Sequence, residues 1–369
     1  MKKELAFGMM RLPVGSDNKI DNVQTKRMVD HFLEHGFRRF DTAEIYHDTF
    51  SEVAVKECIV KRYSREAFEI ADKLSSWRIA EDSSAEKFFN KQLQVTGLEY
   101  FDRYLVHSVE EKLYPDIIAK RYFDFVLEKK SKGLIREAGF SFHGQPELLD
   151  KILAEYPEMD CVQLQINYID WENPAVRSRE CYETARKYGK KILVMEPVKG
   201  GLLAELPAAG AAILKEAAPD LSTASWAIRF AAGLDGVDTV LSGMSSMEQL
   251  QDNVAIMENF KPLNDEELET LGKLRAFLNR NPMVECTGCG YCLAECPLEL
   301  PISSFIRLRN NTGVFGAIPR IKNAYKAHTA KHTPDECVNC GSCTNVCPQH
   351  LDIPYHLSSL AKWAKENGL

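Results

Sequence analysis

Two short cysteine runs near the C-terminus constrain this chain more than any other feature. Eight of its 11 cysteines lie there, and both runs have the spacing Cys-x2-Cys-x2-Cys-x3-Cys-Pro. The first run is Cys286, Cys289, Cys292 and Cys296, and the second is Cys337, Cys340, Cys343 and Cys347. Three closely spaced thiolates can surround one iron–sulfur cluster while the fourth reaches a second cluster. The spacing therefore predicts two [4Fe–4S] clusters.

The same spacing predicts how the two runs share these clusters. One cluster would be bound by Cys286, Cys289, Cys292 and Cys347, and the other by Cys337, Cys340, Cys343 and Cys296. Disulfides would need an oxidising compartment, and the N-terminus shows no signal peptide. Structural zinc commonly uses paired Cys-x2-Cys motifs rather than four cysteines in one run. The other cysteines fit no pattern and are predicted to be buried structural thiols: Cys58, Cys161 and Cys181.

The chain between and after the cysteine runs favours helices. Cys296 and Cys337 are separated by 40 residues, more than a compact small ferredoxin uses. Residues 302–309, 319–326 and 353–367 predict helices, so we expect a small, mainly helical ferredoxin-like domain over residues 282–369. Basic side chains gather in the insert: Arg307, Arg309, Arg320, Lys322, Lys326 and Lys331. They fit a docking face for an electron carrier of ferredoxin or flavodoxin type, or a solvated helix face.

The first two-thirds of the chain alternate short apolar runs with amphipathic segments of helix length. Eight strands are predicted, at residues 4–10, 38–42, 68–72, 103–107, 136–141, 161–166, 191–196 and 238–242. Helices are predicted at residues 22–35, 51–61, 85–96, 116–132 and 177–188. Such alternation implies parallel strands, and eight repeats imply a closed (β/α)8 TIM barrel over residues 1–262. No GxGxxG motif follows a strand, so a Rossmann domain is not supported.

Polar side chains stand at the carboxyl ends of three predicted strands. Asp41 ends the second strand, with Tyr46 in the loop beyond it. Lys73 ends the third strand and His107 the fourth. These strand ends meet at one mouth of a (β/α)8 barrel, where its chemistry takes place. Each residue alone is more often a surface or packing residue, but the four together predict an active site.

At these residues the sequence resembles the aldo/keto reductase family, over nearly the whole predicted barrel. The matching segments are residues 7–13, 36–46, 70–73 and 104–107. The resemblance implies oxidoreduction of a small carbonyl or alcohol substrate by a catalytic tetrad: Asp41, Tyr46, Lys73 and His107. Tyr46 would exchange a proton with the substrate oxygen, and the Lys73 cation would lower the tyrosine pKa from ~10. Asp41 would hold the lysine, and His107 would orient the substrate.

The resemblance also implies a nicotinamide cofactor. It assigns contacts with the nicotinamide to Ser141 and Gln165, with phosphate to Ser242 and Gly243, and with adenine to Asp252 and Asn253. The usual asparagine after the serine is Phe142, and the usual stacking aromatic residue is replaced by Met195. Gly243 and Gln249 occupy the places of the usual basic residues for a 2′-phosphate. NADH is therefore expected at least as readily as NADPH, and a flavin is a further candidate.

Hydride transfer moves two electrons, whereas each cluster accepts one. The first hypothesis is therefore a reductase-like enzyme whose clusters relay electrons to or from the active site or a redox partner. The second is a plain NAD(P)H-dependent carbonyl reductase with structural or sensing clusters. The third is an electron carrier with a non-catalytic barrel.

Domain joins and location follow from composition. Residues 263–281 are expected to form a connecting helix and linker, which the Asn281–Pro282 pair ends. The net charge of −7 gives no support to nucleic-acid binding, which would call for a clustered basic face, so no nucleic-acid partner is expected. The sequence has no run of about 18 consecutive apolar residues, so no membrane-spanning helix is predicted. A cytoplasmic protein is therefore expected.

Overall fold

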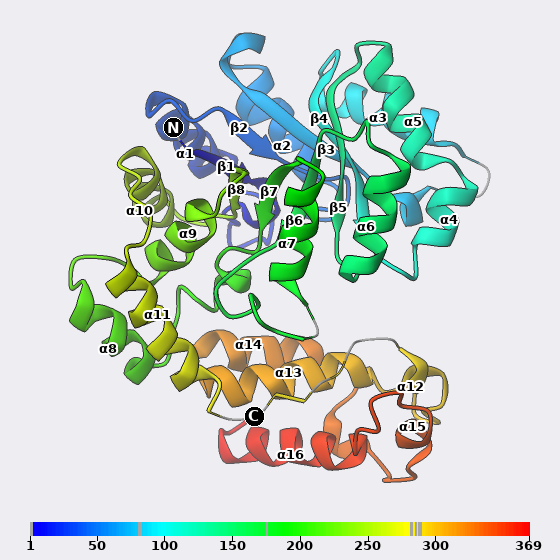
Figure 1. Cartoon of the computed structure of the whole chain (residues 1–369), viewed down its shortest axis with the longest axis vertical. Helices are drawn as coiled ribbons and strands as arrows, with labels where there is room; N and C mark the ends of the chain where they lie inside the picture. The colour runs from blue at the N-terminus through cyan, green and yellow to red at the C-terminus, as the bar shows by residue number, and fades with distance from the viewer. Residues whose placement is uncertain (1–2, 80–82, 175, 281–282, 285, 287–289) are drawn as a thin grey trace. The chain divides into compact units, whose positions relative to one another are not determined.

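A computed structural model describes residues 3–79, 83–174, 176–280, 283–284, 286 and 290–369. Eight parallel strands close into a barrel in sequential order, with β1 pairing with both β2 and β8 (Figure 1). The strands are β1 (Glu4–Gly8), β2 (Arg39–Asp41), β3 (Glu69–Leu74), β4 (Phe101–Val109), β5 (Ile135–Phe142), β6 (Cys161–Gln165), β7 (Lys191–Met195) and β8 (Val237–Ser242). The predicted (β/α)8 barrel is therefore confirmed.

Side chains alternate along each strand between the barrel interior and the outer helices, and the interior positions form layers. The middle layer is apolar and consists of five buried side chains, Ala6, Leu105, Cys161, Leu193 and Leu241. The upper layer, at the carboxyl ends, is polar and buried, and comprises Asp41, Lys73, His107, Ser141 and Gln163. The apolar layer keeps water away from the polar layer, which strengthens the electrostatic interactions within it.

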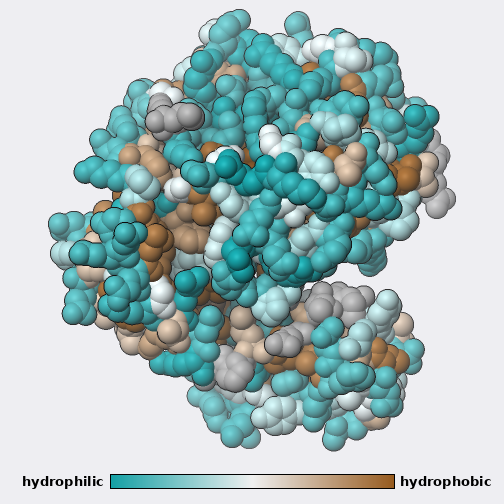
Figure 2. Space-filling view, viewed as in Figure 1, coloured by the Kyte–Doolittle hydropathy of each residue, from teal (hydrophilic) through white to brown (hydrophobic). Residues whose placement is uncertain are grey.

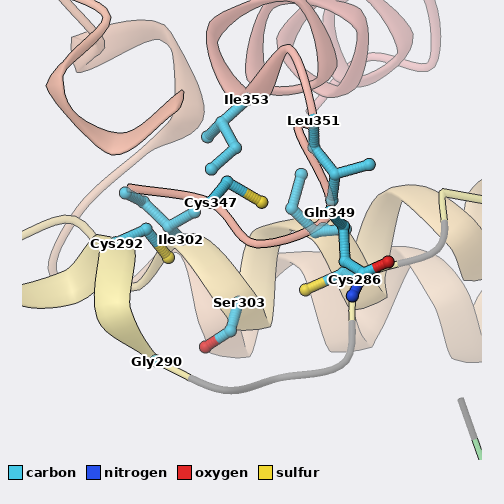
Figure 3. A pocket seen from close by; sticks show the side chains of 10 residues that line it. Cys286, Gly290, Cys292, Ile302, Ser303, Cys347, Gln349, Leu351 and Ile353 are labelled. Atoms are coloured by element: carbon cyan, nitrogen blue, oxygen red, sulfur yellow. The ribbon is translucent and has the colours of Figure 1, made fainter. Parts of the chain in front are cut away.

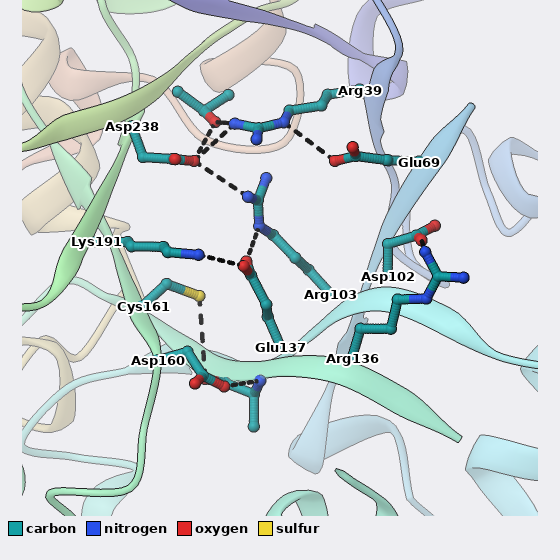
Figure 4. Close-up of polar contacts among 12 residues, drawn as sticks. Arg39, Glu69, Asp102, Arg103, Arg136, Glu137, Asp160, Cys161, Lys191 and Asp238 are labelled. Carbon is teal, nitrogen blue, oxygen red and sulfur yellow. Dashed lines mark hydrogen bonds and ion pairs between the residues drawn. The ribbon is translucent and has the colours of Figure 1, made fainter. Parts of the chain in front are cut away.

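Charged side chains close the opposite, amino-terminal end of the barrel (Figure 4). Arg39 donates to Glu69 at 3.1 Å and to Asp238 at 2.6 Å. Arg103 donates to Glu137 at 2.6 Å and shares Asp238 at 3.1 Å. These contacts tie β2, β3, β4, β5 and β8 together. We assign this ring of charges to barrel stability, since the amino-terminal face of such barrels carries no chemistry.

Helices surround the barrel and bury their apolar faces against the outward side chains of the strands. They are α1 (Asn22–Glu34), α2 (Ser51–Val55), α3 (Ala85–Thr96), α4 (Tyr114–Ala119), α5 (Tyr122–Ser131), α6 (Pro146–Glu155), α7 (Ser178–Lys187), α9 (Thr223–Gly233) and α10 (Met247–Glu258).

The structure corrects three predicted segments. The first strand ends at Gly8 and continues as a short 3-10 turn, Met9–Arg11, instead of reaching residue 10. The helix predicted over residues 51–61 is the short α2 followed by a π-helical turn, Lys56–Val60. The helix predicted over residues 116–132 is two helices, α4 and α5. Arg121 separates them because its φ of 56° is left-handed and cannot continue a right-handed helix.

The chain divides into two compact units, Met1–Gly200 with Ala224–Leu263 and Gly201–Thr223 with Asn264–Leu369. The first unit holds the barrel. The second comprises α8 (Ala208–Ala217), α11 (Asp265–Leu278), α12 (Tyr291–Ala294), α13 (Ile302–Phe315), α14 (Pro319–His328), α15 (Ser342–Asn345) and α16 (Ile353–Glu366). The predicted, mainly helical C-terminal region is confirmed, with α13, α14 and α16 at the expected segments.

The second unit has an apolar core of its own. Phe305 and Ile306 of α13 and Leu357 and Leu360 of α16 are almost fully buried in it. Cys292 also belongs to this core. The side chains that form the core thus include predicted cluster ligands.

The face shown in Figure 2 is mostly hydrophilic, with smaller apolar areas. Within the described ranges, no helix is both long enough and apolar enough to cross a membrane. The Asn281–Pro282 pair, predicted to end the linker, lies outside the described residues.

Candidate active site and metal centres

Three buried side chains converge from neighbouring strands at the carboxyl end of the barrel. Asp41 ends β2, Lys73 lies near the end of β3, and His107 lies in β4. Lys73 is 0% exposed, and Asp41 and His107 are 5% and 6% exposed. Tyr46 joins them from the loop after β2, so the structure brings all four predicted catalytic residues together.

Lys73 lies at the centre of this group. Its Nζ donates to Asp41 Oδ1 at 2.6 Å and to the Thr42 carbonyl at 2.7 Å. The same ammonium lies 4.9 Å from the centre of the Tyr46 ring. Burial alone would lower the pKa of Lys73, but Asp41, with Tyr46, more than offsets this and raises the pKa above its usual value. The lysine is therefore a fixed positive charge beside the tyrosine.

Tyr46 sits on a backbone turn of unusual conformation. The next three residues, His47, Asp48 and Thr49, have φ values of 50°, 52° and 76°. Such left-handed residues need support from their surroundings, and His47 Nε2 accepts the Leu12 N–H at 3.0 Å. Burial raises the pKa of Tyr46, while the charge and hydrogen bond of Lys73 oppose that rise. Tyr46 is thus a protonated phenol at neutral pH.

His107 is neutral and held by a hydrogen bond. Burial lowers its pKa well below the usual value, and the charge of Lys73 lowers it further. Its Nδ1 lies 2.7 Å from the Ser75 hydroxyl. When Ser75 donates to Nδ1, the ring hydrogen resides on Nε2, from which it can point into the mouth. The Trp77 ring lies 5.1 Å from the His107 ring and forms part of the rim.

Sequence reasoning missed two residues that position the tetrad. Gln163 of β6 donates to Asp41 Oδ2 at 3.2 Å, so both oxygens of that carboxylate are engaged. Ser75, just after β3, holds His107. The strand alternation places Gln163 on the interior side, which is a usable signal, whereas nothing in the sequence pairs Ser75 with a histidine 32 residues away.

The predicted nicotinamide contacts hold other protein groups in the structure. Ser141 Oγ accepts the Ser108 N–H at 2.8 Å. Gln165 Nε2 donates to Asp170 at 2.9 Å. Ser141 keeps its hydroxyl hydrogen, and Gln165 Oε1 accepts no hydrogen bond from the described residues. The two residues thus still offer one donor and one acceptor, which a carboxamide requires.

The predicted phosphate and adenine contacts lie on β8, the loop after it and α10. Asn253 donates to the Ser242 hydroxyl at 2.8 Å, so these two are brought together. Asp252 precedes Asn253 on the same helix. The Ser246 hydroxyl accepts the Gln249 N–H at 3.3 Å and caps the N-terminus of α10. Gly243 lies between Ser242 and this cap.

An arginine that sequence reasoning missed lies over this loop. A Cβ built on Gly243 would meet Arg11 side-chain carbons at 3.2 Å, and one on Gly200 would meet Arg11 Nη2 at 3.4 Å. The Ser245 hydroxyl donates to the Arg11 carbonyl at 2.8 Å. Arg11 therefore places a cation between the loops after β7 and β8. Only the closure of the barrel brings the turn after β1 to the loops after β7 and β8, so no sequence spacing reveals it.

The first predicted cluster site is a cavity in the second unit (Figure 3). Cys286 and Cys292 line it from the first run, and Cys347 lines it from the second. Its other walls are mainly apolar, and include Ile302 and Ile353. Cys289 lies outside the described residues. The shared cavity is the arrangement that crossed ligation predicts.

The second predicted cluster site is also a cavity lined by cysteines of both runs. Its cavity is lined by four cysteines, Cys296, Cys337, Cys340 and Cys343. Cys340 is exposed, and hydrogen bonds with the backbone and hydroxyl of Ser342 lower the pKa of its thiol. Thiolates ligate iron, so an apolar cavity with this donor set fits a [4Fe–4S] cluster.

The remaining cysteines are buried away from these cavities, as predicted. Burial raises the thiol pKa of Cys58 to about 11 and those of Cys161 and Cys181 to about 12. They are inert packing residues of the barrel unit.

Fold and site together define a barrel oxidoreductase with a helical iron–sulfur domain. The profile of the aldo/keto reductase family matches residues 4–276, and that of the 4Fe-4S dicluster domain matches residues 282–351. The chain belongs to the aldo/keto reductase family.

Known proteins agree with this assignment. An uncharacterised oxidoreductase of Bacillus subtilis, YqkF, is 23% identical over 73% of this chain and 91% of its own length. L-Galactose dehydrogenase of Arabidopsis thaliana is 23% identical over 72% and 86%. Among solved structures, the holo form of aldo-keto reductase AKR11C1 from Bacillus halodurans is 25% identical over 73% and 91%, with a TM-score of 0.59. A Klebsiella pneumoniae aldo/keto reductase in complex with NADP and acetate shares the fold, at 18% identity over 73% and 90% and a TM-score of 0.61.

Proposed function

We propose that this protein reduces a small carbonyl substrate in its barrel and that its two clusters exchange single electrons with that site or with a redox partner. The observation that carries the proposal is the contact of Lys73 Nζ with both Asp41 and Tyr46, beside His107. The Tyr46 and His107 rings meet edge-on at 6.2 Å, so one substrate oxygen can reach both.

The protein groups divide the work at the substrate oxygen. His107 donates from Nε2 to the carbonyl oxygen and fixes its position. Tyr46 gives its hydroxyl proton to that oxygen as negative charge develops there, and Lys73 stabilises the resulting phenolate. Because Tyr46 is protonated at neutral pH, it carries the proton that carbonyl reduction requires. The relative that acts on L-galactose supports a small hydroxylated substrate.

A nicotinamide cofactor fits the residues at the barrel mouth. When bound, it supplies the hydride. Ser141 and Gln165 would hold its carboxamide, Ser242 and Gly243 its phosphate, and Asp252 and Asn253 its adenine. Arg11 would add the positive charge that the positions of Gly243 and Gln249 lack. Two solved structures of aldo/keto reductases from Klebsiella pneumoniae, one in complex with NADP and one with NADPH, favour NADPH, whereas the missing basic residues favour NADH.

The C-terminal cavities fit two clusters, which when bound supply one-electron transfer. We propose that residues 282–369 form this domain, joined by residues 263–281 to the barrel of residues 1–262, in a cytoplasmic protein. A ferredoxin or flavodoxin-type carrier is the proposed electron partner. A flavin in the barrel would split electron pairs, and the plain reductase and the electron carrier remain the alternatives to the relay.

An anaerobic titration tests the proposal. Cluster-loaded protein is treated with NADPH, with NADH, or with dithionite as the control reductant, while the cluster absorbance is followed and released flavin is assayed. Bleaching by a nicotinamide supports the relay and identifies the cofactor. Normal reduction by dithionite with no bleaching by either nicotinamide contradicts the relay. Carbonyl reduction by the same sample would then favour the plain reductase, and its absence the electron carrier.

A further inference from the structure

Two buried carboxyl groups lie behind Lys73, on the side facing the helices. Asp72 precedes the lysine on β3, and Glu52 reaches the same place from α2. Asp72 is 0% exposed and Glu52 is 3% exposed. The tetrad uses neither carboxyl, yet Asp72 is the residue directly before its central cation, Lys73.

A glutamine on α3 joins these carboxyls to the lysine backbone. Gln92 Nε2 donates to Glu52 Oε1 at 2.8 Å and to Asp72 Oδ1 at 3.1 Å. The Lys73 carbonyl lies 3.1 Å from the same Nε2 and shares one of its two hydrogens, while the Lys73 N–H donates to Asp72 Oδ1 at 2.8 Å. Tyr104 donates its hydroxyl to Gln92 Oε1, which fixes the orientation of the amide. Both backbone groups of the lysine are thus clamped by this network.

The contact between the two carboxyls requires a hydrogen. Asp72 Oδ2 is buried and receives no hydrogen bond from a donor group of the described residues. The side chains of Asp72 and Glu52 nevertheless lie side by side, because oxygens of both accept from the same Gln92 Nε2, at 3.1 and 2.8 Å. Two ionised carboxylates are both acceptors and would repel at this range, so one of them must carry a proton.

Resting on the proposed function, we propose that Glu52 and Asp72 share one proton and together act as positioning residues for Lys73. The shared proton closes the network that clamps the lysine backbone. It also limits the pair to one negative charge behind the Lys73–Tyr46 contact.

The surrounding charges agree with a single shared proton. Burial raises the pKa of Asp72 well above its usual value, and the neighbouring Glu52 charge raises it further. Burial also raises the pKa of Glu52. Beyond the pair, Glu44 acts on Glu52 with the same sign of charge, whereas Lys91 and Lys73 act on the pair with the opposite sign. Lys73 already pairs with Asp41 at 2.6 Å, so its charge does not replace the proton.

Infrared spectroscopy detects the proton directly. Wild-type protein at about pH 8, where ordinary carboxyls are ionised, should show the C=O stretch of a protonated carboxylic acid. Glu52→Gln and Asp72→Asn should each abolish that band. Its absence from the wild-type spectrum would overturn the proposal. The measurement does not require the protein to reduce a carbonyl, so its failure is distinct from failure of the proposed function.

A double-mutant cycle gives an independent result. Either amide alone places one hydrogen-bearing group between two acceptors, as the shared proton does, so Glu52→Gln and Asp72→Asn should each unfold near the wild-type temperature. In a cycle of Glu52→Ala, Asp72→Ala and the double variant, either alanine alone leaves the other carboxyl buried without its shared hydrogen, so the double variant should unfold at a temperature clearly above that expected from adding the two single effects. Additive effects would overturn the proposal.

The positioning role has its own readout. Asp72→Ala removes the acceptor of the Lys73 N–H and one negative charge, so kcat should fall about tenfold with KM unchanged. The alkaline limb of the kcat profile, set by Tyr46, should move to lower pH. Asp72→Asn should restore most of kcat. If Asp72→Ala and Asp72→Asn lose activity equally with an unchanged pH profile, the pair only packs the strand.

Discussion

The barrel and the second unit prepare their chemistry in opposite ways. In the barrel, the polypeptide itself completes the candidate active site. Lys73 Nζ has two oxygen partners, Asp41 is held at both oxygens, and His107 is held by Ser75. In the second unit, cysteines line two cavities and contribute to the apolar core. That core needs the two [4Fe–4S] clusters, which the polypeptide does not itself supply.

This difference separates folding from function in one region and joins them in the other. A barrel with its own apolar core folds whether or not a cofactor is bound, so changes at its mouth should affect rate or binding. The cluster ligands of the second unit bridge α12, α15 and the loops around them, so free energy of cluster binding becomes free energy of folding. Each prediction below tests one side of this contrast.

The largest effect is expected from paired cysteine substitutions that distinguish crossed from uncrossed ligation. Cys286→Ser with Cys347→Ser removes two ligands of one predicted cluster, so iron should fall from about eight to about four atoms per chain. Cys286→Ser with Cys296→Ser removes one ligand from each cluster and should leave clearly less iron. Iron analysis of anaerobically purified protein measures both.

The control for these variants is Cys181→Ser, which changes a buried barrel thiol and should leave all the iron in place. The barrel should stay folded in every variant by circular dichroism. If Cys286→Ser with Cys296→Ser leaves four irons and the crossed pair leaves fewer, each run binds its own cluster and the crossed assignment is wrong.

The next largest effect is expected at Tyr46. Tyr46→Phe removes the proton donor and leaves the ring, so kcat for carbonyl reduction should fall roughly 10² to 10⁴-fold. The melting temperature should stay near that of the wild type, because the barrel core is untouched. Tyr182→Phe is the matched control, since the Tyr182 hydroxyl donates to the exposed Asp235 carbonyl at 2.8 Å and not to a residue of the tetrad. Unchanged turnover of Tyr46→Phe would remove the tetrad from the mechanism.

The same contrast explains what the sequence could predict. Cluster ligands are local, so spacing alone identified Cys337, Cys340 and Cys343 around one cavity. The tetrad was found from strand ends, because parallel strands of a closed barrel must deliver their carboxyl ends to one mouth. Arg11 and Ser75 were missed because their roles depend on side-chain directions after closure. The helix break at Arg121 was missed because nothing in the composition requires a left-handed residue there.

A smaller effect is expected at Arg11. Arg11→Met keeps the packing of the side chain over Gly243 but removes its charge. A charge-assisted hydrogen bond contributes about 1.5–3 kcal/mol, so the dissociation constant for NADPH or NADH should rise roughly tenfold to a hundredfold. Cofactor fluorescence measures binding, with Arg38→Met as a control at the other end of the barrel. Equal affinity of Arg11→Met and the wild type would remove Arg11 from the cofactor site.

The smallest effect is expected at Ser75, and its sign is the informative part. The Ser75 hydroxyl donates to Nδ1 only when His107 is neutral, so this hydrogen bond favours the neutral ring. Ser75→Ala should therefore raise the pKa of His107, and activity should begin to fall at a higher pH as the solution is acidified. The loss of one neutral hydrogen bond, about 1 kcal/mol, should lower kcat/KM about fivefold at neutral pH. A pH–rate profile measures both the shift of the acid limb and the fall in kcat/KM, with Ser131→Ala, a change at an exposed serine, as the control. An acid limb displaced to lower pH would show that the Ser75 hydroxyl accepts a hydrogen bond from His107 instead.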